Sequence, residues 1–126
     1  MLGYVTIGAN DIEASGKFYD AVFAAIGSER KSSEGGWFFY GPKGGEGFVG
    51  LCSPFDKKPA TGGNGSMLGF KAASTDAVKA AYAAALANGG SDEGAPGFRP
   101  ADATSGFYGA YMRDPAGNKL CVYFNS

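Results

Sequence analysis

The side chains best suited to chemistry in this sequence are two cysteines, Cys52 and Cys121, and a few arginines and carboxylates. There is no histidine, which excludes a Ser-His-Asp triad, a Cys-His pair and an imidazole-bound zinc ion. If the fold brought the two thiols together, they would form a disulfide or bind a soft metal such as Cu(I) or Zn²⁺, although two thiols do not complete a zinc tetrahedron. We expect both cysteines to be buried structural residues in a reduced, cytoplasmic protein.

Composition narrows the classes of partner. The 126 residues carry 11 basic and 12 acidic side chains, a net charge of −1. That balance provides no basic surface for nucleic acid or for an anionic membrane. No apolar run approaches the roughly 20 residues of a membrane span, and the amino terminus has no signal-peptide pattern. We expect a single domain that binds neither nucleic acid nor a membrane.

The strands and helices that must position any site occur twice along the chain. Residues 4–29 and 67–92 each begin with an alternating stretch, which predicts a strand. Apolar residues then recur at spacings of three and four residues, which predicts a helix. We expect Asn10 and Ser74 to cap the starts of the two helices, with Glu13 close to a capping-box position.

Each predicted helix ends at glycine, Gly27 in one and Gly89 in the other, and short strands follow. These strands are expected at residues 28–33, 36–40 and 47–52 in the first half, and at 94–98, 107–113 and 120–124 in the second. The architecture is therefore βαβββ repeated, with module one at about 1–56, a polar connector at about 57–65 and module two at about 66–126. Each half is too small to close its own core, so we expect the two to share one.

Four stretches of the sequence resemble the vicinal oxygen chelate superfamily, which includes glyoxalase I, bleomycin-resistance proteins and extradiol dioxygenases. They are the opening at 5–19, the segments 60–66 and 95–100, and the closing Asp-Pro-x-Gly-Asn motif within 111–120. The resemblance covers nearly the whole chain. It implies an α+β fold in which two tandem βαβββ modules share a concave mixed β-sheet cavity, and it implies a homodimer.

The resemblance also indicates where a metal would be held, because metal-using members take ligands from the first and last strands of each half. Those positions fall on Tyr4, Met67 and Cys121, and residues 47–52 contain no carboxylate. A hard divalent cation needs oxygen ligands. We therefore expect no metal and no cofactor.

The alternation of side chains along the strands also predicts a cavity without metal ligands. One face of the predicted strands is wholly apolar, and the other, which lines the cavity in this fold, is aromatic, sulfur-containing and weakly polar. Within 37–40 we expect alternate aromatics to face the core. We expect Arg113 to pair with Asp114 or Asp102. The predicted ligand-binding cavity comprises Tyr4, Thr6, Trp37, Phe48, Cys52, Met67, Arg99, Arg113, Cys121 and Tyr123.

Three functions remain open at this point. The leading hypothesis is a metal-free protein that binds a small apolar or aromatic molecule in the cavity, with Arg99 or Arg113 orienting a polar end. The first alternative is a metal-dependent lyase or dioxygenase of the glyoxalase type, with non-standard ligands such as Glu46 and the two cysteines. The second is a scaffold protein whose cavity is filled by Tyr4 and Met67. No catalytic residue is assigned.

Overall fold

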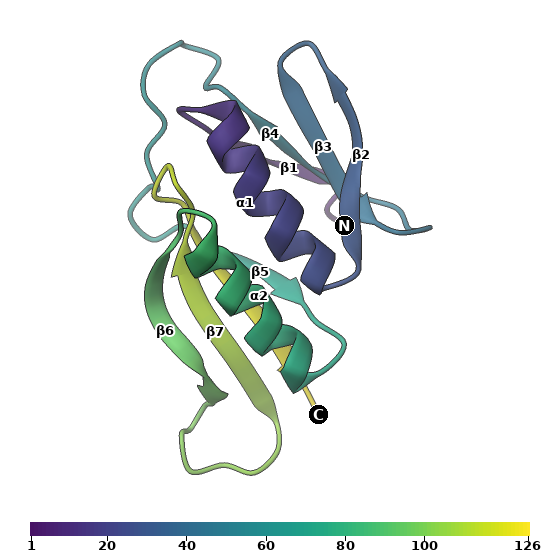
Figure 1. Cartoon of the computed structure of the whole chain (residues 1–126), viewed down its shortest axis with the longest axis vertical. Helices are drawn as coiled ribbons and strands as arrows, with labels where there is room; N and C mark the ends of the chain where they lie inside the picture. The colour runs from purple at the N-terminus through teal and green to yellow at the C-terminus, as the bar shows by residue number, and fades with distance from the viewer.

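The computed structural model describes residues 1–126 and contains the predicted repeat of strand, helix and three strands (Figure 1). The first module consists of β1 (Tyr4–Gly8), α1 (Ile12–Ala25), β2 (Ser28–Glu34), β3 (Trp37–Pro42) and β4 (Phe48–Cys52). The second consists of β5 (Leu68–Lys71), α2 (Thr75–Ala87), β6 (Ser91–Phe98), β7 (Phe107–Arg113) and β8 (Lys119–Asn125). The tandem βαβββ prediction is confirmed. No helix is long and apolar enough to cross a membrane.

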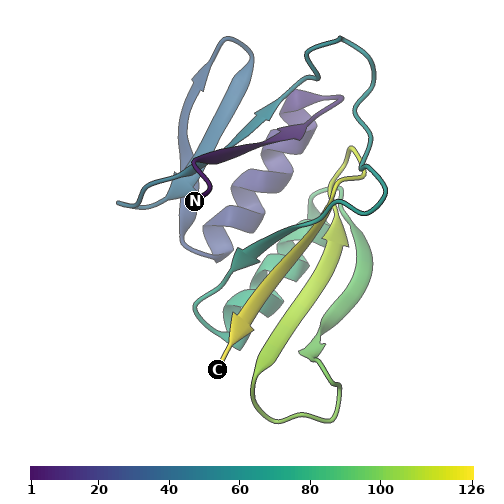
Figure 2. The ribbon, with the colours of Figure 1, turned by 180° about the vertical axis from the view of Figure 1, so that it is seen from behind.

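The strands form two separate four-stranded sheets, ordered β1-β4-β3-β2 and β5-β8-β7-β6. In each sheet the first and last strands of the module pair in parallel, and the remaining pairs are antiparallel. The two helices lie side by side on one side of the sheets (Figure 1). No helix lies on the other side (Figure 2), and we call that sheet surface the open face.

One hydrophobic core serves both modules, as predicted. A single cluster of 18 buried residues contains Phe18, Val22 and Phe23 of α1 together with Val78 of α2. Phe23 also meets Phe70 of β5 edge to face, with ring centroids 5.0 Å apart. Since each helix packs on the sheet of its own module and against the helix of the other, neither module closes a core alone.

The start of α1 differs from the prediction by one residue. Asp11, not Asn10, is the N-cap, and its carboxylate accepts from the backbone N–H groups of Glu13 and Ala14. Asn10 is held instead by the connector, where its side chain bonds both the N–H and the C=O of Ala60. The prediction for the second helix is confirmed, because Ser74 caps α2.

The closing Asp-Pro-x-Gly-Asn motif joins the two modules. Tyr19 of α1 donates its hydroxyl to the buried carboxylate of Asp114, with 2.6 Å between the oxygens. The Asn118 side-chain amide donates to that same carboxylate and to the C=O of Gly8, each at 2.9 Å. The other Asp114 oxygen accepts from the N–H groups of Ala116 and Asn118. The motif is therefore a structural link between the halves.

Candidate functional site

Four aromatic rings form a continuous surface on the open face of the first module. The rings of Tyr4 and Phe48 stack, with centroids 4.9 Å apart and planes 5° apart. Phe39 meets Phe48 edge to face at 5.5 Å, and Trp37 stacks on Phe39 at 5.6 Å. Tyr4 is 59% exposed and Phe48 39%. We call these four residues the aromatic wall; its exposed rings can stack on a planar ligand.

Strand alternation and one glycine place the aromatic wall. Phe38 and Tyr40 point into the core, so Trp37 and Phe39 point to the open face, as predicted for 37–40. Gly50 lies beneath the indole, because a Cβ at that position would stand 2.7 Å from the Trp37 ring. Phe39 was missing from the predicted cavity, although the same alternation identifies it.

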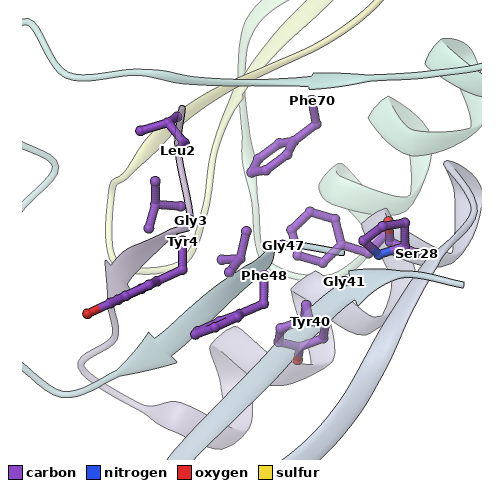
Figure 3. A pocket seen from close by; sticks show the side chains of 13 residues that line it. Leu2, Gly3, Tyr4, Ser28, Tyr40, Gly41, Gly47, Phe48 and Phe70 are labelled. Carbon is purple, nitrogen blue, oxygen red and sulfur yellow. The ribbon is translucent and has the colours of Figure 1, made fainter. Parts of the chain in front are cut away.

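A separate apolar cavity of about 250 Å³ lies beside the aromatic wall, between the two modules (Figure 3). Phe70 projects into it from the second module, and the stacked rings of Tyr4 and Phe48 lie along its edge (Figure 3). The sequence does not indicate this cavity, because it depends on how the two modules pack. The rest of its lining is Leu2, Gly3, Val5, Phe23, Ser28, Tyr40, Gly41, Pro42, Gly47 and Val49.

The open face of the second module combines aromatic, sulfur and cationic groups. Phe107 of β7 stacks on Tyr123 of β8, with centroids 5.4 Å apart. Further along the same two strands, Tyr111 pairs in register with Cys121. The charged groups of Arg99 and Lys119 lie near the Tyr111 ring. Strand alternation would have found Phe107, Tyr111 and Lys119, which the prediction omitted.

Both cysteines are buried and free, as predicted. Burial raises the pKa of the Cys52 thiol. Burial also raises the pKa of the Cys121 thiol, and the Tyr111 hydroxyl and Arg99 charge beside it only partly oppose that shift. Both thiols are therefore protonated at neutral pH, which makes them weak nucleophiles and weak metal ligands.

The positions where the resemblance implies a metal do not fit one. Tyr4 is stacked on Phe48, Met67 is a 48% exposed thioether, and Cys121 holds a neutral thiol. Glu46, the carboxylate considered for non-standard ligation, is exposed in the loop before β4. No group of three or more His, Cys, Asp or Glu side chains in residues 1–126 is arranged to hold a metal ion.

Within one chain the predicted site residues are spread over both sheets and do not meet in one cavity. Thr6 and Met67 line a cleft between β1 and β5, and Cys52 lies at the end of β4. The predicted partner of Arg113 is wrong: its guanidinium pairs with Glu93 at 2.8 Å. The reason is that the Asp114 carboxylate points into the core and already accepts bonds from neighbouring donors.

Comparisons with known proteins agree on the fold. The model of the Glyoxalase/Bleomycin resistance protein/Dioxygenase superfamily matches residues 1–122. A glyoxalase/bleomycin resistance protein from Albidiferax ferrireducens T118 is 41% identical, with a TM-score of 0.89 over 100% of this chain and 99% of that one. No protein with a curated description matches.

Two more distant structures share the fold alone. A glyoxalase-related enzyme from Fulvimarina pelagi is 18% identical with a TM-score of 0.76, over 99% of this chain and 88% of that one. A glyoxalase/bleomycin resistance protein/dioxygenase family enzyme from Burkholderia phytofirmans PsJN is 20% identical with a TM-score of 0.74, over 98% of each chain.

Proposed function

Because the chain belongs to the glyoxalase/bleomycin resistance protein/dioxygenase superfamily, whose fold serves many chemistries, we propose its function from the site itself. The protein binds a small aromatic or apolar molecule without a metal, and the aromatic wall is the binding surface. The observation that carries this proposal is the stacked, solvent-exposed pair of Tyr4 and Phe48, in which Tyr4 stands where the resemblance implies a metal ligand.

The exposed aromatic rings of the wall favour a flat, apolar ligand. A planar ring laid on Tyr4 and Phe48 would remove exposed apolar surface from water and gain about 0.5–1.5 kcal/mol from each aromatic contact. Glu34 is the one carboxylate among the residues that line the hollow over the wall. Binding here is sequestration: the wall excludes water from one face of the ligand, and no bond is made or broken.

A second copy of the chain would cover the other face of the ligand. The open faces of both sheets lack a covering layer (Figure 2), and they expose Tyr4, Phe48 and Met67. Exposed apolar clusters of this kind mark binding or assembly surfaces. We include a homodimer in the proposal, with a two-fold axis that sets the open face of one copy against that of its partner. The two free thiols suit a reducing compartment such as the cytoplasm.

The one tryptophan of the chain lies in the aromatic wall, so its fluorescence reports ligand binding there directly. We expect saturable quenching of Trp37 by neutral 2-naphthamide, and weaker binding by at least about fivefold in Tyr4→Ala because one stacking partner is lost. Phe55→Ala is the matched control, since Phe55 is fully exposed outside the wall. No quenching at millimolar naphthamide, or equal affinity in Tyr4→Ala and the control, would refute the proposal. Sedimentation equilibrium tests the dimer.

A further inference from the structure

We propose that the ligand is an aromatic carboxylic acid, whose ring lies on the aromatic wall of one copy and whose carboxylate is held by Arg99 and Lys119 on the second module of the facing copy; this rests on the ligand-binding dimer proposed above. Arg99 follows β6 and Lys119 begins β8, the two strands that flank Tyr111 of β7. Neither cation forms an ion pair with an acid. An arginine suits a carboxylate because its planar guanidinium matches two carboxylate oxygens.

Arg99 is the one arginine of the chain without an acid. Arg30 pairs with Asp20 at 2.7 Å and Arg113 pairs with Glu93 at 2.8 Å. The Arg99 guanidinium instead donates to two backbone carbonyls, those of Ala95 at 2.9 Å and Phe98 at 3.2 Å. These bonds hold the guanidinium in place but leave its charge uncompensated.

Two glycines make room for that fixed position. A Cβ on Gly97 would stand 3.0 Å from one terminal nitrogen of Arg99, and a Cβ on Gly94 would stand 3.5 Å from the other. The guanidinium therefore folds back over β6, next to backbone that has no side chains. An arginine already fixed in this way loses little conformational entropy when it binds an anion.

Lys119 brings a second positive charge to the same ring, and it acts on Glu93 only from beyond ion-pair distance. Its ammonium nitrogen lies 5.8 Å from the Tyr111 centroid, and the Arg99 guanidinium carbon lies 5.7 Å from it. Neither cation has a carboxylate within 4.0 Å. Glu93, the nearby acid, is bound by Arg113. An anion bound beside the Tyr111 ring would be attracted by both cations.

The remaining groups of this surface match the rest of such a ligand. Burial raises the pKa of the Tyr111 phenol, so the ring beside the two cations stays neutral, with its hydroxyl against the Cys121 thiol. The stacked pair of Phe107 and Tyr123 lies further along the same face. Tyr123 is two residues from Cys121, the partner of Tyr111, which is about 7 Å along a strand. A bicyclic aromatic acid spans that distance.

The test is isothermal titration of the full chain with 2-naphthoate and with its neutral amide, 2-naphthamide. We expect 2-naphthoate to bind at least tenfold more tightly than 2-naphthamide. Arg99→Gln should remove about tenfold of 2-naphthoate affinity and Lys119→Gln about threefold, with 2-naphthamide unchanged. Lys17→Gln, which removes an exposed lysine on α1, is the matched control and should change neither affinity. A higher salt concentration should weaken the binding of 2-naphthoate but not that of 2-naphthamide.

The outcomes separate this inference from the function that it deepens. Equal affinity for the acid and the amide, with Trp37 quenched by both, would overturn the carboxylate site and leave the proposed function standing. Tight 2-naphthoate binding that Arg99→Gln and Lys119→Gln do not weaken would also overturn it. If neither compound binds, the proposed function fails and this inference fails with it.

Discussion

The hydrogen bond between Tyr19 and Asp114 joins the first helix to the closing motif, so its removal tests how the modules are held together. In Tyr19→Phe the ring and its packing remain, and only the hydroxyl that donates at 2.6 Å is lost. Both residues are buried, Tyr19 fully and Asp114 with 4% exposure. The substitution therefore isolates one buried hydrogen bond to a carboxylate.

The expected loss in unfolding free energy is about 2 kcal/mol. A hydrogen bond to a charged group contributes roughly 1.5–3 kcal/mol. The lower part of that range applies because the Asp114 carboxylate keeps three other donors, two N–H groups and the Asn118 amide. For a chain of this length the midpoint of thermal unfolding should fall by about 8 °C.

Urea denaturation followed by circular dichroism measures this effect, and the m-value should not change. The matched control is Tyr82→Phe, which removes a hydroxyl that donates to Asp92 at 2.9 Å in an exposed setting. We expect no measurable loss in that variant, because water replaces the partner. Equal stability of Tyr19→Phe and Tyr82→Phe would refute the view that the buried link stabilises the shared core.

Three further predictions concern the core and the thiols. Gly16→Ala should lower the unfolding free energy by about 1–3 kcal/mol, because the new Cβ would stand 2.5 Å from the Phe38 ring. The control Gly3→Ala, which places its Cβ in open space, should leave the urea midpoint unchanged. Burial and Asp114 raise the folded-state pKa of Tyr19, so stability is full below the unfolded tyrosine value of about 10 and falls as pH rises above it; Tyr19→Phe should flatten that alkaline decline in urea midpoints. Both thiols should react with a disulfide reagent at pH 8 far more slowly in the folded than in the urea-unfolded protein. Equal thiol rates in the two states would contradict their burial.

The elements and their order could be predicted because they depend on local periodicity. Strand alternation and helical spacing within 4–29 and 67–92 are read from neighbouring residues, and the structure confirms both. The helix cap shows the limit of local reasoning: Asn10 and Asp11 are both good caps, and Asn10 is engaged by Ala60, fifty residues away.

The sequence by itself determined the repeated plan, the shared core, the aromatic character of the open face and the poor donor set at the expected metal positions, because each follows from residue type and strand parity. Only the tertiary structure decided which charges are neutralised. Arg99 and Arg113 look alike in the sequence, yet Arg113 of β7 pairs with Glu93 of β6, while the hydrogen-bond partners of Arg99 are backbone carbonyls. Such pairings depend on register and on bulges in β6, which residue type does not encode locally.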